Sequence, residues 1–201
     1  EHVNFNASAQ KYGHDVETLE RRTGVVIQTG RKLFAKLVKP FGMTQEMVDL
    51  TATTALEHFT ATIASELLRN PHIQALMQDK TMEYMWLWHA VEENEHKAVA
   101  YDVYEEIFGR GVKAYALRNT ALVVSMVAIF LTQSSFVIKL LRDDGKLNLK
   151  ELGMIYQYAY SPSKGIIAGM AGEMLAYFKP GFHPNDLDTV QLLQDWKAKL
   201  G

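Results

Sequence analysis

The sequence contains no cysteine, so neither a disulfide nor a thiolate ligand can support the fold or hold a metal ion. Any metal would have to be bound by His, Asp and Glu side chains. The absence of cysteine also fits a reducing cytoplasm, where we expect the protein to work, with association to a membrane as the alternative. Only five prolines interrupt the 201 residues, which leaves long stretches free to form helices.

The chain also lacks an excess of charge of either sign. Its formal net charge is −2, and it has no basic run or aromatic and basic stripe that could neutralise a phosphate backbone, so we expect no nucleic-acid partner. With 48% hydrophobic and 22% charged residues, residues 1–201 are predicted to form one helical metal-binding domain. The first residue is Glu1 and no signal peptide follows it, so we expect the chain to start partway into a longer gene product.

Apolar residues recur at spacings of three and four, which predicts an all-α protein. The predicted helices end where the sequence breaks helices, before Pro40, at Pro71 and at Gly109. We expect helices over residues 15–38, 44–70, 81–108, 112–141, 147–158, 162–178 and 186–200, with a short helical piece at 72–77.

The segment "WHAVEENEHKAV", residues 88–99, places two histidines and a glutamate on one side of a predicted helix. His89, Glu93 and His96 fall within about 60° of the helix circumference. The same stripe carries apolar residues, which indicates that it faces the core: Met82, Met85, Trp86, Ala100, Val103 and Ile107. The opposite side is expected to face solvent, with Glu83, Asn94, Glu95, Asp102, Glu105 and Glu106. Glu92 lies at the margin of the stripe, where it could act as a ligand or as a catalytic base.

Buried carboxylates and imidazoles need compensation, and a divalent cation supplies it. Glu93-x-x-His96 is the Glu-x-x-His arrangement of di-iron and di-manganese helix bundles. On the preceding helix, Glu57 is the one carboxylate on a stripe of small or apolar residues, namely Leu50, Thr53, Ala61, Ala64 and Leu68. We therefore predict a metal site between these helices. Two alternatives stay open, an arginine partner for Glu57 and a polar network that only fixes helix register.

Three segments resemble a bacterial family of predicted metal-dependent hydrolases: "TALEHFTA" (54–61), "WHAVEENEHKAVAYDVY" (88–104) and "FKPGFHPND" (178–186). The resemblance implies a ferritin-like helical bundle with additional C-terminal helices. It also implies a metal centre formed by Glu57, His89, Glu93 and His96. Members carry an earlier helix with a "QE…H…EH" pattern, and Glu1-His2 resembles the end of that pattern. This implies that His2 is a further ligand and that the rest of that helix is missing here.

Two mechanisms suit such a site. A metal-activated water could hydrolyse a carbonyl or phosphoryl substrate, with Glu92 or Glu57 as the catalytic base. Alternatively, two irons could activate dioxygen to oxidise an apolar, acyl-like substrate. Because Met82, Met85 and Trp86 border the ligands, we favour the oxidative mechanism and iron, one or two ions, with manganese or zinc as alternatives. A non-catalytic metal-binding scaffold is the third hypothesis.

Residues 119–138 form a run of 20 residues without a charge. That length could span a bilayer, yet a central helix of a soluble bundle is also apolar on all sides. We expect the run to line a tunnel for a small, lipid-like apolar substrate, with peripheral membrane contact as an alternative. A homo-oligomer is also expected.

Overall fold

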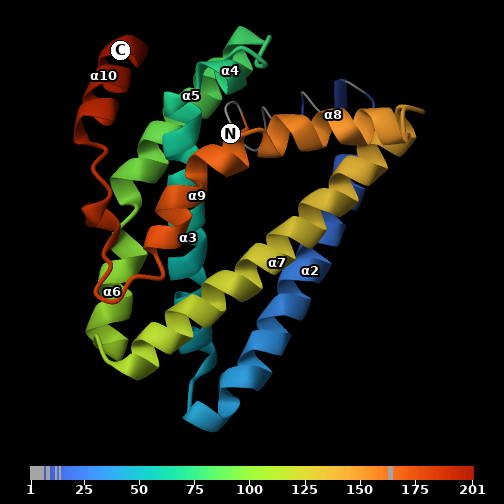
Figure 1. Ribbon diagram of the computed structural model, residues 1–201. Helices are drawn as coiled ribbons and strands as arrows, with labels where there is room; N and C mark the ends of the chain where they lie inside the picture. The colour runs from blue at the N-terminus through green and yellow to red at the C-terminus, as the bar shows by residue number, and fades with distance from the viewer. Residues whose placement is uncertain (1–6, 8–9, 12, 14, 163–164) are drawn as a thin grey trace.

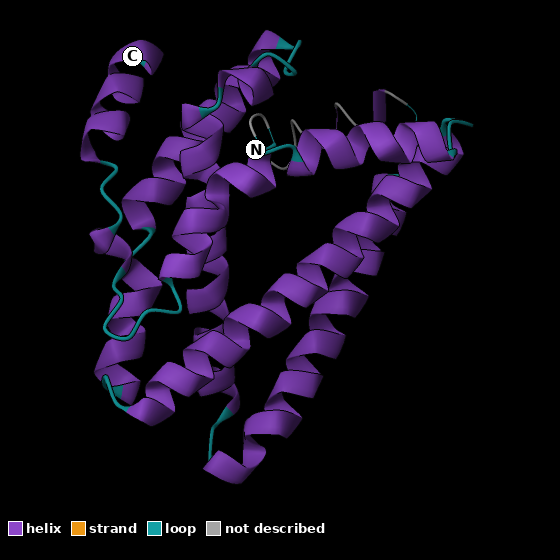
Figure 2. Ribbon diagram, viewed as in Figure 1, coloured by secondary structure: helices purple, strands orange, loops and turns teal. Residues whose placement is uncertain are grey.

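The computed structural model describes residues 7, 10–11, 13, 15–162 and 165–201. All elements within these residues are helices, which confirms the all-α prediction (Figure 2). The α-helices are α2 (Val16–Val38), α3 (Gln45–Arg69), α4 (Pro71–Gln74), α5 (Lys80–His96), α6 (Val99–Phe108), α7 (Val112–Asp143), α8 (Leu149–Tyr160), α9 (Ile166–Ala176) and α10 (Val190–Leu200). The 3₁₀ helices are η1 (Lys39–Phe41) and η2 (Pro184–Asp186).

Capping residues in the sequence explain where several helices begin. The Asp15 carboxylate accepts a hydrogen bond from the Thr18 amide at 3.0 Å, which caps α2. Asp79 caps α5 in the same way, accepting from two backbone amides of the first turn. At the end of α6, Gly109 has φ +68°, a backbone conformation that other residues rarely adopt.

The predicted single helix over 81–108 is wrong, because the structure divides it into two helices. α5 ends at His96 and α6 begins at Val99, with Lys97 and Ala98 forming a turn between them. The Lys97 ammonium donates to the Leu187 carbonyl and, at 3.0 Å, to the Thr189 hydroxyl. This anchor ties the turn to the segment that leads into α10.

Helix α3 is the central element and packs against α5, α6, α7 and α9 (Figure 1). Its buried residues are mostly small, namely Thr51, Thr54, Ala55, Ala61, Thr62, Ala64 and Ser65. Small side chains allow neighbouring helices to approach closely. The threonine hydroxyls are satisfied within the helix, since Thr51 donates to the Met47 carbonyl and Thr62 to the His58 carbonyl, both at 2.7 Å. Buried polarity on α3 is therefore largely satisfied.

Helices α2 and α7 run side by side, and α8 leads from the far end of α7 back to α9 (Figure 1). The turn between α2 and α3 is short, so these two helices run in opposite directions. Beyond α9, the chain passes along α6 before α10 packs against α5. Helices α2, α3 and α7 are therefore neighbours, and a cavity lies between them.

A buried arginine fixes the loop that follows α9. Arg118 of α7 is 4% exposed and donates to the Tyr177 carbonyl and, at 2.7 Å, to the Lys179 carbonyl. Its guanidinium carbon lies 4.8 Å from the centre of the Tyr177 ring, a distance that suits a cation–π interaction. The Tyr101 hydroxyl donates to the Phe182 carbonyl of the same loop.

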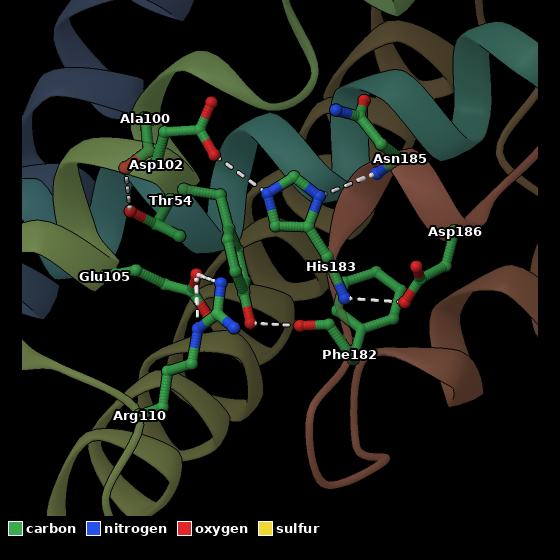
Figure 3. Close-up of polar contacts among 10 residues, drawn as sticks. Thr54, Ala100, Asp102, Glu105, Arg110, Phe182, His183, Asn185 and Asp186 are labelled. Atoms are coloured by element: carbon green, nitrogen blue, oxygen red, sulfur yellow. Dashed lines mark hydrogen bonds and ion pairs between the residues drawn. The ribbon is translucent and has the colours of Figure 1, made fainter.

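His183 completes this anchoring. One ring nitrogen, Nε2, lies 2.8 Å from an Asp102 carboxylate oxygen, and the other, Nδ1, accepts from the Asn185 amide at 3.2 Å (Figure 3). The His183 amide donates to Asp186, so the two residues cap η2 reciprocally. The segment "FKPGFHPND" is therefore held to α6 by Tyr101 and Asp102 and to α7 by Arg118, before the chain continues into α10.

Replacing Arg118 with leucine should destabilise the fold by about 3 kcal/mol, because two loop carbonyls would lose their charged donor. Urea denaturation followed by circular dichroism would measure this loss. Arg110→Ala serves as the control, since Arg110 makes an exposed ion pair with Glu105 and should cost less than about 1 kcal/mol. Equal effects of the two substitutions would contradict the anchoring role.

Candidate functional site

His89, Glu93 and His96 lie along one side of α5, as the spacing predicts. His89 Nε2 is 3.2 Å from a Glu93 carboxylate oxygen. The His89 side chain is 33% exposed and that of Glu93 is 23% exposed, whereas His96 is exposed. The stripe is therefore partly accessible to solvent along its length within the described residues.

The prediction that this stripe faces the hydrophobic core is wrong. The buried residues of α5 lie on the opposite side and comprise Leu87, Ala90, Val91 and Asn94. Three residues expected in the core are exposed, since Trp86 is 38% exposed, Val103 43% and Ile107 51%. Apolar residues occur on both sides of α5, and the cluster formed with Ala64 and Leu68 of α3 selects the side of Leu87.

Asn94 was expected to face solvent, and this expectation is also wrong. Its side chain is 2% exposed and accepts a hydrogen bond from the Ser65 hydroxyl of α3 at 2.7 Å. The Asn94 amide nitrogen donates to the Ala90 carbonyl at 2.9 Å. This polar pair sits in the α3–α5 contact and fixes the register of the two helices.

Glu57 of α3 is half-buried, and the charges of two α5 side chains influence its pKa. Burial raises the pKa of Glu57, the negative charge of Glu93 raises it further, and the charge of His96 lowers it. An interaction with both groups requires the three side chains to lie near one another across the neighbouring helices. Glu57 of α3 therefore lies within reach of the charges of Glu93 and His96 of α5, and His89 contacts Glu93.

The donor types in this set suit a divalent cation, because imidazole and carboxylate groups bind zinc, iron and manganese. Their arrangement is incomplete within the described residues, where no three His, Asp or Glu side chains converge closely enough to hold one ion. Glu92 is half-buried beside Glu93. His2, the further ligand that the resemblance implied, lies outside the described residues. Glu57 of α3 and His89, Glu93 and His96 of α5 thus supply one side of the candidate site, and their roles as ligands stay predictions.

The structure reveals another buried carboxylate, Glu66, on the side of α3 opposite Glu57. Glu66 is 9% exposed and accepts from the Asn70 side-chain amide at 2.7 Å. It packs against Gly169 of α9, where an added Cβ atom would lie 2.2 Å from the carboxylate. Sequence reasoning missed Glu66, although a glycine within the apolar α9 is a signal of such close approach.

An apolar cavity of about 550 Å³ lies beside α3, and none of the candidate site residues lines it. Its walls are formed by α2, α3 and α7, and on α3 they include Thr53 and Leu56. Thr53 lies one helical turn before Glu57 on nearly the same side of α3. The cavity and the Glu57 carboxylate are therefore neighbours along one helix.

His58, next to Glu57 in the sequence, points away from the candidate site and packs in the core. Its ring is 2% exposed and lies 4.6 Å from the ring of Tyr177, centre to centre. Burial lowers the pKa of His58 to about 4, since the charged imidazolium would lose its hydration. Its Nε2 atom has no hydrogen-bond partner among the described residues. His58 therefore supports the fold and does not face Glu93.

Residues 1–188 match the family described as predicted metal-dependent hydrolase. No curated protein and no solved structure matches the chain significantly. The family resemblance inferred from three short segments thus extends over most of the chain, while the ferritin-like architecture stays a prediction.

The pKa of His58 predicts how stability depends on pH. Between pH 6.5, the ordinary pKa of histidine, and about 4, the unfolded chain protonates this residue while the folded chain does not. Stability should therefore fall as the pH drops through that window, by up to about 3 kcal/mol. In His58→Phe this contribution should disappear, which urea denaturation in the presence of EDTA would measure.

His72→Phe provides the matched control, because His72 is exposed. It should keep the same pH dependence as the unmodified chain. A pH dependence that is identical in all three proteins would show that His58 is not the buried neutral group.

Proposed function

Because the chain belongs to the family of predicted metal-dependent hydrolases, we propose that it hydrolyses its substrate at the set of Glu57, Glu93, His96 and His89 between α3 and α5. The observation that carries the proposal is the 3.2 Å contact between His89 Nε2 and a Glu93 carboxylate oxygen on α5, and the charge of Glu93 also raises the pKa of Glu57 on the neighbouring helix. Two half-buried carboxylates that repel each other favour the binding of a cation. A divalent metal is implied by the family, and iron, zinc and manganese all suit these donors.

When bound, a divalent cation acidifies a water molecule and polarises a carbonyl or phosphoryl group. His89, Glu93 and His96 share one side of α5, and Glu93 together with one of the two histidines would supply part of the ligand set that such a cation needs. Glu57 has a raised pKa and can carry a proton closer to neutral pH than an ordinary carboxyl group, which suits a general acid or base. Glu92, half-buried at the edge of the same stripe, is the second candidate for this role.

Hydrolysis is favoured over the oxidative di-iron mechanism expected from the sequence. That expectation depended on Met82, Met85 and Trp86 enclosing the ligands in an apolar interior. Trp86 is 38% exposed and His96 is exposed, so these residues do not enclose the stripe. The family match supports the hydrolytic alternative and gives no support to oxidation.

The function is tested with chain loaded in turn with Zn²⁺, Mn²⁺ and Fe²⁺ and assayed on p-nitrophenyl butyrate and bis(p-nitrophenyl) phosphate. We expect metal-stimulated hydrolysis of one probe, and a loss of at least about a hundredfold in Glu57→Gln and Glu93→Gln. Bound metal, measured by elemental analysis, should fall in Glu93→Gln.

Glu95→Gln is the matched control, because Glu95 lies on the same helix and pairs with Lys197 at the surface. It should retain metal and activity within about twofold. Retained metal with no hydrolysis of either probe would favour the non-catalytic scaffold. Equal losses in Glu93→Gln and Glu95→Gln would refute the assignment of the site.

We further propose that the protein contacts an anionic membrane surface along α7. This helix is long and apolar enough to cross a membrane by length and composition, and only 17% of its most apolar window is buried. Its exposed side carries Val123, Val127, Phe130 and Leu131 at helical spacing. Since its other side packs against α2 and α3, this stripe can meet a membrane without leaving the fold.

The distribution of charged residues along the chain supports binding to a negatively charged lipid surface. Residues 15–43 and 112–160 each contain six Lys or Arg and three Asp or Glu, whereas residues 45–111 contain four basic and twelve acidic residues. The helices α2, α7 and α8 thus carry the positive side of a chain that is nearly neutral overall. Basic residues beside an exposed apolar stripe are typical of peripheral binding to anionic lipids.

Sedimentation with vesicles tests this contact. Vesicles of phosphatidylcholine with phosphatidylglycerol should bind the chain, and Phe130→Ser/Leu131→Ser should weaken binding by about tenfold or more. Val190→Ser on the exposed side of α10 is the control and should bind normally. The unmodified chain could instead fail to bind vesicles and form a stable dimer that the double substitution disrupts. This result would show that the stripe is a contact between copies of the chain.

A further inference from the structure

We propose that the cavity between α2, α3 and α7 holds the aliphatic chain of an acyl ester or amide, with the carbonyl end directed toward Glu57. The inference rests on the proposed function, because it names the substrate class of the same site. It is argued from the shape, the polarity and the charge of the cavity.

One end of the cavity is closed by the core. Phe34, Val48 and Ala121 line it there and are 3%, 2% and 2% exposed, respectively. The other end is lined by Thr23 of α2, Leu56 of α3 and Gln133 of α7. On α3 the lining extends from Val48 to Leu56, one residue before Glu57, and on α2 it extends from Phe34 to Thr23. Along α3 the cavity therefore extends from the core toward Glu57, which does not itself line it.

Its dimensions suit a flexible chain. From Phe34 to Thr23 the wall of α2 extends about 16 Å, at 1.5 Å per residue. A volume of about 550 Å³ over this length gives a mean cross-section of about 35 Å². A slot that is long and narrow accommodates an extended aliphatic chain better than a fused ring system.

Polar groups are distributed unequally along the slot. Phe34, Val48 and Ala121 line the closed end, with the Arg31–Asp49 ion pair beside them, and much of the walls consists of Val, Ile, Leu, Ala and Phe side chains. Thr23, Thr53, Thr132 and Gln133 gather toward the end near Glu57, while Ser125 and Gln28 lie between the ends. An apolar tail therefore fits the closed end, and a carbonyl group fits the polar end.

The one ion pair on the wall argues against a free carboxylate as the ligand. Arg31 donates through Nε to an Asp49 carboxylate oxygen at 2.6 Å and through a terminal nitrogen to the other oxygen. This two-point pairing offsets the arginine charge, so the wall offers no net positive charge to an anion. A neutral ester or amide is the better match for the cavity.

Two glycines of α2 provide a matched test. Gly30 lines the cavity and Gly24 does not, and a Cβ atom added at either would meet nothing within 4 Å. Leucine at either position also favours the helix over glycine, so both variants should fold. In Gly30→Leu the side chain would occupy part of the slot, whereas in Gly24→Leu it would lie at the surface.

The probe is Nile red, a neutral apolar dye, displaced by straight-chain alcohols of increasing length. The unmodified chain and Gly24→Leu should bind long alcohols equally well. Gly30→Leu should bind the longest alcohols at least about tenfold more weakly and shift the preference to shorter ones. Equal affinities in all three proteins, or the absence of any dependence on chain length, would overturn the proposal.

A second measurement separates this proposal from the proposed function. Glu93→Gln should bind the alcohols normally, because Glu93 does not line the cavity. Normal alcohol binding in an unmodified, metal-loaded chain that hydrolyses neither probe would support the cavity and refute the catalytic site. If Gly30→Leu hydrolyses esters with the same preference for acyl length as the unmodified chain, the cavity is refuted as the substrate site.

Discussion

The close packing of neighbouring helices on α3 is the constraint on which the remaining structure depends. The buried positions of α3 are mostly alanine, threonine and serine, and these small side chains let α5, α7 and α9 approach the same helix from different sides. Threonine hydroxyls that bond within the helix avoid the cost of unsatisfied buried polar groups. A large side chain at one of these positions would separate α3 from a neighbour and change both the candidate site and the cavity.

The candidate site and the cavity both follow from the placement of α3. One side of the helix carries Glu57 toward the histidines and glutamate of α5, and the adjoining side forms a wall with α2 and α7. Electrostatic repulsion between Glu57 and Glu93 is maintained because the Ser65–Asn94 contact fixes how α5 lies on α3. A polar hydrogen bond inside the helix contact thus holds two like charges near each other.

Much of the helical layout could be predicted from the sequence, because prolines, glycines and capping residues mark most helix ends. The division at Lys97 and Ala98 could not, since neither residue breaks a helix and the anchor for Lys97 lies some 90 residues later in the chain. The shared side of His89, Glu93 and His96 follows from spacing alone. The spacing does not show which side of α5 is buried, because Trp86 and Leu87 offer apolar surface in different directions and only the partner helix selects one.

The contact between Glu66 and Gly169 has a consequence for sequence variation. A side chain at position 169 would force the Glu66 carboxylate to move, because an added Cβ atom would lie 2.2 Å from it. A shorter residue at position 66 would remove that limit and would also leave the Asn70 amide without its acceptor. Among homologues these three positions should covary as one unit, independently of the residues around Glu57.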